Sequence, residues 1–184
     1  MTMKTIIFII GSIVLIYISR ASLRQPRSHG FHRFFAWEAM LGLFLLDVEF
    51  WFRNPFAWYQ LIAWTLLFAS IVPLAFGVQA LRARGKPTEN RAGDPSLLAF
   101  EKTTALVTTG IYRYIRHPLY SSLFLLTWGT FFKLPSLWGG LLAVTATVFL
   151  ILTAKADEAE CTNFFGPQYQ EYMKRTKMFL PFLF

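Results

Sequence analysis

The chain has a single cysteine among its 184 residues, Cys161. One thiol excludes an internal disulfide and a cysteine-rich metal site. Cys161 has no base beside it in the sequence, so we expect a small buried residue rather than a nucleophile. Histidines are equally scarce: His29 and His32 lie three residues apart without a third ligand near them, and we therefore predict no metal site.

Glycine-rich turns of the kind that join a strand to a helix are missing as well. Without such a turn, neither a P-loop nor a dinucleotide-binding Rossmann fold is available to the chain. We also find no internal repeat and no low-complexity stretch, so the chain is expected to form one compact unit.

Acidic residues are few, with ten Asp and Glu against 18 Lys and Arg, while 55% of the residues are hydrophobic and 18% are aromatic. Several apolar runs approach the roughly 20 residues that cross a bilayer as a helix. We therefore predict an all-α, multi-pass transmembrane helical bundle. The net charge of +8 does not indicate nucleic acid, because Lys and Arg beside spanning segments more often report orientation.

Five spans are predicted, followed by a short cytoplasmic amphipathic helix over residues 168–177 and an apolar tail, residues 178–184, that returns to the membrane surface. Pro73 should kink the third span. The fourth has only 14 apolar residues, roughly 21 Å, so either the bilayer thins there or the helix begins below the interface. The spans are expected at residues 5–19, 34–52, 56–81, 119–132 and 137–154.

The chain is expected to be a single membrane-embedded domain, residues 1–184, whose parts differ in composition. The predicted parts are three N-terminal spans (1–81), a polar cytoplasmic loop (82–118), a helical hairpin (119–154) and a C-terminal segment that closes the cofactor site (155–184).

Positive charge is distributed unevenly between the two sides of this arrangement. Fifteen of the 18 Lys and Arg residues fall in the first connector, the polar loop and the C-terminal segment, which leaves only Lys4, Arg53 and Lys133 opposite. The positive-inside rule then predicts a multi-pass membrane protein with its N-terminus outside and its C-terminus in the cytoplasm.

Three acidic residues interrupt the second span, where ionisable groups are costly. Asp47 and Glu49 lie near its far end, and a local ion pair with Arg53 is the simpler explanation for them. Glu38 is kept as a candidate polar group in the bundle interior.

The densest group of polar side chains lies in residues 110–120, which hold two arginines, one histidine and three tyrosines. Pro118 suits the first position of a helix, where its missing N–H costs nothing. Arg116 and His117 would then lie beside the free N–H groups of that helix, a site suited to a carboxylate or a phosphate. The alternative is that Arg-His-Pro only anchors the helix at the headgroups.

The helical hairpin should bring Arg116 and His117 close to Asp157 and Glu158. Cationic and anionic groups side by side suit a zwitterionic ligand. The alternative is a purely structural ion pair between Arg116 and Glu158. Three tyrosines could add stacking faces or a cation–π contact to an onium centre: Tyr112, Tyr114 and Tyr120.

Residues 109–120 resemble the Arg-His-Pro-x-Tyr signature of the isoprenylcysteine carboxyl methyltransferases and the related phospholipid methyltransferases. Asp157-Glu158, followed by residues 164–169 and Tyr172, is similar to the acidic pair and the Phe-Gly-x-x-Tyr-x-x-Tyr run of that family. The resemblance is specific in order and spacing, but it is confined to the C-terminal part of the chain. The first three spans match only in hydropathy and number.

Members of this family are integral membrane enzymes that use S-adenosylmethionine without a Rossmann domain. The carboxylate, ammonium and sulfonium of S-adenosylmethionine match the ligand pattern inferred above. The resemblance implies Arg116 and Glu158 as catalytic candidates. It implies a cofactor-binding set of Tyr112, Arg116, His117, Pro118, Tyr120, Asp157 and Glu158.

Two departures from the family pattern are visible. The acidic pair is Asp157-Glu158 rather than two glutamates, and Lys155 stands where the family often has an arginine before the pair. The residue that orients the methyl acceptor is therefore left open.

The predicted activity is methylation of a lipid or lipid-modified acceptor that enters sideways between spans at the cytoplasmic membrane face. Two alternatives remain: an NADPH-dependent membrane reductase of the sterol reductase type, and a non-catalytic lipid-binding membrane module. The sequence leaves open the acceptor, the choice of O-, N- or S-methylation, and the oligomeric state.

Overall fold

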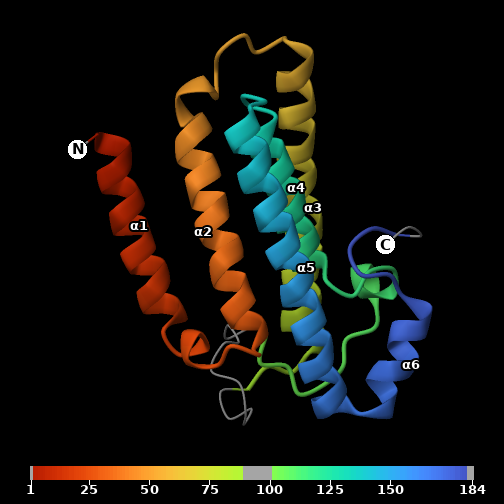
Figure 1. The fold of residues 1–184 in the computed structure, drawn as a ribbon. Coiled ribbons are helices and arrows are strands. Elements are labelled where there is room, and N and C mark those ends of the chain that lie inside the picture. The colour runs from red at the N-terminus through yellow and green to blue at the C-terminus, as the bar shows by residue number, and fades with distance from the viewer. Residues whose placement is uncertain (1, 89–100, 182–184) are drawn as a thin grey trace.

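The fold is a bundle of long helices with one short helix beside its lower end (Figure 1). The computed structural model describes residues 2–88 and 101–181. Within them the helices are α1 (Met3–Ser19), α2 (His29–Asp47), α3 (Trp58–Arg84), α4 (Pro118–Phe131), α5 (Leu137–Phe165) and α6 (Pro167–Arg175), with short 3-10 turns η1 (Ser22–Arg24), η2 (Val48–Phe50) and η3 (Gly110–Arg113). For the described residues, the predicted all-α fold class is confirmed.

Parts of two predicted segments lie outside the described residues. These parts are residues 89–100 of the polar loop and residues 182–184 of the C-terminal segment.

The four central helices pack in two pairs, α2 with α5 and α3 with α4. Helix α4 also contacts α5, and α1 packs on the outer side of α2 (Figure 1). Helix α6 turns back from the lower end of α5 and lies beside it. The end of α3, the start of α4 and the end of α5 therefore meet at the lower end of the bundle.

Local capping signals decide where the helices begin and end. The Ser28 side chain accepts a hydrogen bond from the N–H of Phe31 at 3.2 Å, so α2 begins at His29, earlier than the predicted span. Helix α5 continues past residue 154 to Phe165, which places the Asp157-Glu158 pair on a helix. It stops at Gly166, whose φ of 63° favours glycine, and the predicted stop and restart at Gly166-Pro167 are confirmed.

Small residues let α3 and α4 approach closely. A Cβ on Gly129 would lie 2.9 Å from Leu67 Cγ and 3.1 Å from the Leu67 backbone nitrogen. A Cβ on Gly77 would lie 3.1 Å from Pro118 Cγ, so α3 also approaches the start of α4 closely. The position of the Arg-His-Pro motif thus depends on this helix pair.

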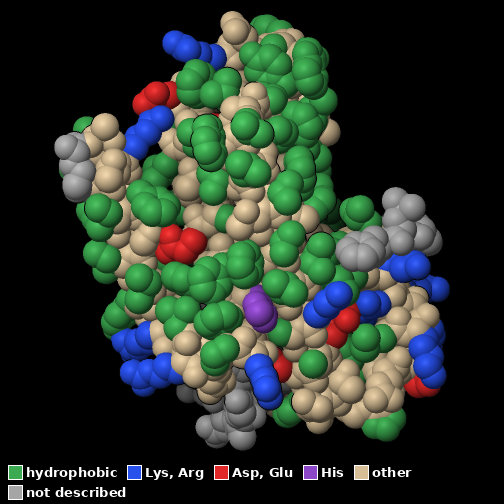
Figure 2. Space-filling view, viewed as in Figure 1, with side chains coloured by type: hydrophobic (Ala, Val, Ile, Leu, Met, Phe, Trp, Pro, Cys, Tyr) green, Lys and Arg blue, Asp and Glu red, His purple; other side chains and the backbone are tan. Residues whose placement is uncertain are grey.

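Helices α3 and α5, with 27 and 29 residues, are long and apolar enough to cross a membrane, whereas α1 is apolar but shorter. Many large apolar side chains of α3 and α5 point outward, among them Phe68 and Phe76 on α3 and Val144 and Val148 on α5. Figure 2 shows apolar side chains over most of the bundle, with many Lys and Arg side chains at its lower end and around α6. This surface fits a membrane protein. The number of spans and their orientation stay predictions.

Two of the three acidic residues of the second span have partners other than those expected, and the buried Asp47 carboxylate has no hydrogen-bond partner among the described residues. Glu49 pairs with Lys4 of α1 at 3.2 Å, and the Arg53 guanidinium lies over the Phe50 ring instead. Glu38 accepts a hydrogen bond from Ser12 of α1 at 2.8 Å. The expected ion pair with Arg53 was wrong, because the outer end of α1 lies within reach of Glu49.

We predict that Gly129→Ala lowers the free energy of unfolding by about 1–3 kcal/mol, since Leu67 and the α3 backbone cannot both withdraw. The matched control is Gly140→Ala on α5, whose new Cβ would meet only Phe131 at an ordinary 3.6 Å. That variant should be neutral or gain up to about 1 kcal/mol from helix propensity. Thermal unfolding in detergent measures both, and equal melting temperatures for the two variants would contradict the close packing of α3 on α4.

Candidate active site

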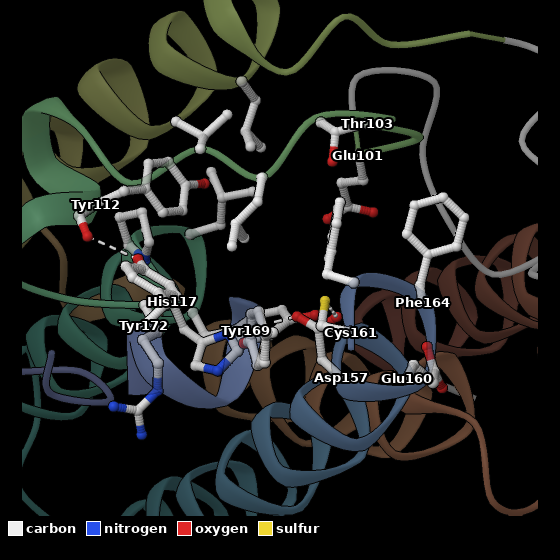
Figure 3. A pocket seen from close by; sticks show the side chains of 18 of the residues that line it. Glu101, Thr103, Tyr112, His117, Asp157, Glu160, Cys161, Phe164, Tyr169 and Tyr172 are labelled. Carbon is white, nitrogen blue, oxygen red and sulfur yellow. Dashed lines mark hydrogen bonds and ion pairs between the residues drawn. The ribbon is translucent and has the colours of Figure 1, made fainter. Parts of the chain in front are cut away.

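A cavity of about 380 Å³ lies at the lower end of the bundle (Figure 3). Its wall comes from the end of α3, the segment 101–107, η3, the start of α4, the end of α5 and α6. Six of the seven predicted cofactor-site residues line it: Tyr112, Arg116, His117, Pro118, Tyr120 and Asp157. The seventh, Glu158, is not among the described lining residues, and its carboxylate contacts Arg116 and His117 instead.

The backbone just before α4 is bound by another part of the chain. Pro118 is the first residue of α4, as expected. The backbone N–H groups of Arg116 and His117 donate to the carbonyls of Lys177 at 2.8 Å and Met178 at 3.1 Å. These acceptors belong to residues 176–180, here called the C-terminal strap. The strap takes only donors that precede the helix, so an anion site at the free N–H groups of α4 itself stays a prediction.

The strap is held to the motif along its length. Lys177 N–H donates to the carbonyl of Tyr114 at 3.1 Å, so residues 115 and 177 form a parallel backbone bridge. The Ser121 hydroxyl donates to the Phe179 carbonyl at 2.8 Å. Met178 and Phe179 are buried against Tyr120 and α5. The strap is thus part of the structure that positions the cavity wall.

Arg116 forms the ion pair that the sequence analysis left as an alternative. Its Nε donates to Glu158 Oε1 at 2.7 Å. Its Nη1 donates to the carbonyls of Met173, at 3.3 Å, and Thr176. Arg116 therefore connects α5, α6 and the strap, and its catalytic role stays a prediction.

His117 is almost fully buried between the two carboxylates of the acidic pair. Its Nδ1 lies 3.4 Å from Asp157 Oδ2 and its Nε2 lies 3.3 Å from Glu158 Oε1. The ring also stacks on Tyr120, with ring centroids 5.4 Å apart. Two carboxylates one residue apart on α5 can bracket the imidazole because His117 lies just before α4, which packs on α5.

The charges of this cluster stabilise one another. Burial by itself would lower the pKa of His117, but the Asp157 and Glu158 carboxylates outweigh it and the pKa is raised. Burial would likewise raise the pKa of Asp157, yet His117 and nearby groups lower it to about 2. The Glu158 pKa is also lowered, by His117 and Arg116 against burial. Folding therefore favours the ionised forms of both carboxylates and the protonated form of His117.

Aromatic rings form one side of the cavity. Tyr112, Tyr169 and Tyr172 are buried, and the Tyr172 hydroxyl donates to the Tyr112 carbonyl at 2.6 Å. Burial raises the pKa of Tyr169 and Tyr172, so both phenols stay neutral. Tyr114, proposed above as a stacking face, is half-exposed and does not line the cavity.

Glu101, which no sequence motif indicated, lines the cavity from within the polar loop. Its carboxylate accepts from Arg33 Nη1 at 3.2 Å, and the Arg33 guanidinium lies over the Trp37 ring. Arg33 is buried in α2, far from Glu101 in sequence. No local pattern could have found this pair.

A second acid–base pair, also missed, joins α2 to α5 at Glu160. The backbone N–H of His29 donates to Glu160 Oε1 at 2.8 Å, and His29 Nδ1 lies 2.5 Å from Glu160 Oε2. Possible ligand atoms of His29, Asp157 and Glu160 lie within 4.8 Å of one another. These groups are already held by ion pairs with each other and with His117, and we assign no metal to them.

The α-helical period could have indicated part of this arrangement. Glu160 follows Asp157 by three residues, and Cys161 follows it by four, so all three share one face of α5. Cys161 lines the cavity and its thiol donates to Asp157 Oδ1 at 3.5 Å. It is only partly buried, in contrast to the expectation of a buried residue.

Thermal stability should depend on pH because of this cluster. Protonated His117 contributes stability below its usual pKa of 6.5, and this contribution is lost as the pH rises through the raised folded value. Ionised Asp157 and Glu158 contribute stability above their usual pKa values of 3.8 and 4.5. This contribution is lost as the pH falls through their lowered folded-state pKa values. The melting temperature should therefore be highest between about pH 4.5 and 6.5. His117→Gln should flatten the decline on the alkaline side, and identical pH profiles for this variant and the wild type would contradict the assignment.

Replacing Arg116 should loosen the C-terminal segment. We expect Arg116→Gln to speed tryptic cleavage at the exposed Lys174-Arg175 sequence several-fold, since α6 and the strap lose their guanidinium contacts. Arg113→Gln, an exposed arginine three residues earlier, serves as the control and should leave the rate unchanged. Equal cleavage rates for the two variants would show that Arg116 does not hold this segment.

Comparisons with known proteins agree with the motifs. The phospholipid methyltransferase family matches residues 95–168. A methanethiol S-methyltransferase of Pseudomonas deceptionensis is 28% identical over 151 residues, which cover 79% of this chain and 48% of the relative. Human protein-S-isoprenylcysteine O-methyltransferase is 37% identical over 82 residues, 44% of this chain and 29% of the relative. The corresponding protein of Schizosaccharomyces pombe is 34% identical over 83 residues, 45% of this chain and 35% of the relative.

No solved structure matches the chain. The chain spans about half the length, or less, of these curated relatives. The matched region nevertheless contains the Arg-His-Pro motif and the acidic pair, which the fold brings together at one cavity. Over this region the chain is similar to the phospholipid and isoprenylcysteine methyltransferases.

Proposed function

We propose that this chain is an integral membrane methyltransferase that uses S-adenosylmethionine to methylate a lipophilic acceptor at the cytoplasmic membrane face. The observation that carries the proposal is the cavity itself. It brings the Arg-His-Pro motif, Asp157 and four buried tyrosines to one end of an apolar bundle. Methyltransferase names among the relatives support the same reaction class.

The cavity fits the cationic part of S-adenosylmethionine. Asp157 lines it as an ionised carboxylate and can accept hydrogen bonds from an ammonium. The neutral rings of Tyr112, Tyr169 and Tyr172 offer π faces to a sulfonium. A cavity of about 380 Å³ is within the usual range for a small-molecule site, about 300–1,000 Å³.

We place the donor's carboxylate at the first turn of α4, beside the free N–H groups at which the sequence predicts an anion site. His117 is the N-cap residue, and no described side chain caps this turn by a hydrogen bond. Leu119 and Tyr120 follow Pro118 and both line the cavity. Their N–H groups, together with the positive end of the helix dipole, suit a carboxylate.

When bound, S-adenosylmethionine supplies a methyl group on a sulfonium, and transfer by in-line displacement depends mainly on alignment. The residues of this chain bind the donor, orient it and shield it. Asp157 holds positive charge, and the strap covers the start of α4. Glu158 acts through Arg116 and His117, which it positions, so we assign it a positioning role.

The membrane assignment rests on the apolar outer surface and on charge. We propose five spans with the N-terminus outside, so that the basic lower end and the cavity face the cytoplasm. Leu81 at the end of α3 and Leu119 at the start of α4 give the cavity an apolar wall close to the bundle surface. A lipophilic acceptor could enter from the bilayer past this wall, which agrees with a relative named for isoprenylcysteine.

The sterol reductase alternative has less support. A dinucleotide phosphate needs free arginines, whereas Arg116, which lines the cavity, is paired with Glu158, and Arg33, which does not line it, is paired with Glu101. The matched relatives carry methyltransferase names.

Calorimetric binding of S-adenosylmethionine to the detergent-purified chain tests the proposal. The wild type should bind, and His117→Ala and Glu158→Ala should each weaken binding by about tenfold or more, because the site loses its internal charge balance. Glu171→Gln removes an exposed carboxylate of α6 that pairs with Lys174 outside the cavity, and should bind like the wild type.

Melting temperatures measured alongside show which variants are folded. A folded wild type that binds neither S-adenosylmethionine nor its demethylated product would refute the methyltransferase assignment.

A further inference from the structure

The cavity has two chemically different ends. Tyr112, His117 and Tyr172 lie toward one side in Figure 3, while Glu101 and Phe164 lie toward the other. We call the second side the carboxylate end, because Glu101 and Glu160 both line it. Asp157 lies between the two ends, since its carboxylate is 3.4 Å from His117 and within 4.8 Å of a Glu160 oxygen. The aromatic end and Asp157 suit the methyl donor, so the side with Glu101 and Phe164 is left for the acceptor.

Glu101 is held in the wall from two directions. Arg33 of α2 binds its carboxylate at 3.2 Å, and the side chains of both residues are largely buried. Its segment is tied to the end of α3, where Thr104 N–H donates to the Gly85 carbonyl at 2.9 Å. Gly85 has no room for a side chain, since a Cβ would lie 2.4 Å from Thr103 Cγ2. The Glu101 carboxylate is therefore a built feature of the cavity.

The described cations at the cavity already have anionic partners. Arg33 binds Glu101, Arg116 binds Glu158, and His117 lies between Asp157 and Glu158. The remaining Arg116 contacts go to backbone carbonyls of α6 and the strap. At the carboxylate end, the described lining residues include no Lys or Arg.

This charge distribution discriminates between acceptors. An acceptor carboxylate placed beside Glu101 and Glu160 would meet like charge in a partly desolvated site, which costs free energy. A protonated amine would be attracted there, but nearby carboxylates raise its pKa and keep its lone pair occupied. A thiol arrives neutral, packs against the apolar Phe164 and carries a proton that a carboxylate can accept.

We propose that the acceptor is a neutral thiol on an apolar carrier, and that Glu101 is the specificity-determining residue that excludes carboxylates and accepts the thiol proton. On transfer, the acceptor sulfur gains a bond to the methyl carbon and the bond from that carbon to the donor sulfonium breaks, leaving a neutral thioether. The S–H proton passes to Glu101 and then to water. This inference rests on the methyltransferase function proposed above.

The test uses two acceptors with the same tail, dodecanethiol and dodecanoate, and the full chain in detergent with S-adenosylmethionine. The wild type should methylate the thiol at least about tenfold faster than the carboxylate at neutral pH. Glu101→Gln should slow thiol methylation by at least about tenfold at neutral pH, with recovery as the pH passes the pKa of the thiol. Calorimetry measures binding without turnover, with dodecanoate titrated into the protein in the presence of the demethylated donor. The Glu101→Gln variant should bind dodecanoate more tightly than the wild type does.

The control is Glu171→Gln, which removes a carboxylate outside the cavity and should change neither acceptor preference nor dodecanoate binding. A wild type that binds S-adenosylmethionine but methylates dodecanethiol no faster than dodecanoate overturns this inference alone. A loss of rate in Glu101→Gln that is equal at every pH and accompanied by a lower melting temperature also overturns it, since Glu101 would then only anchor Arg33. Absence of S-adenosylmethionine binding by the folded wild type overturns the methyltransferase function itself.

Discussion

The contact of His117 with Asp157 and Glu158 is the interaction on which the rest of the site depends. It joins the start of α4 to the polar end of α5, and these two helices form one hairpin. Through Glu158 the same cluster holds Arg116, and through Arg116 it reaches α6 and the strap. One buried set of charges therefore positions the start of α4, α6 and the segment that follows it.

Such a cluster is stable only because its charges are paired. A single buried carboxylate or guanidinium carries a large desolvation cost, which a well-placed partner and further hydrogen bonds offset. Pairing of this kind recurs around the cavity, in Arg33 with Glu101, in His29 with Glu160, and in the His117 cluster. The pairs lie where α2, α5 and the segment before η3 meet, so they orient the cavity wall before any ligand arrives. In the pairs of Arg33 with Glu101 and of His29 with Glu160, the carboxylate lines the cavity and its cation does not. A ligand in the cavity therefore meets the carboxylates.

Most predictions that depended on neighbouring residues were confirmed. The all-α class, Pro118 at the start of α4, and the stop and restart at Gly166-Pro167 follow from apolar runs and backbone preferences that act within a few residues. The meeting of His117 with the acidic pair also followed, since a short turn between two helices makes them antiparallel neighbours. The contact between the C-terminal strap and this motif was not predicted, for the opposite reason. A segment some 60 residues further along the chain, with no pairing signal of its own, accepts hydrogen bonds from the N–H groups of Arg116 and His117.

The sequence by itself determined which segments form helices, the boundaries at Pro118 and at Gly166-Pro167, and which motif carries polar side chains, because helix periodicity and capping are local. Only the tertiary structure decided which groups face the cavity. Glu101 and Arg33 are 68 positions apart, and they meet because α2 packs on α5 while the segment after α3 folds back over the same end. Burial then required each charge to find a partner, and such partners are chosen by proximity in space rather than by spacing in the chain.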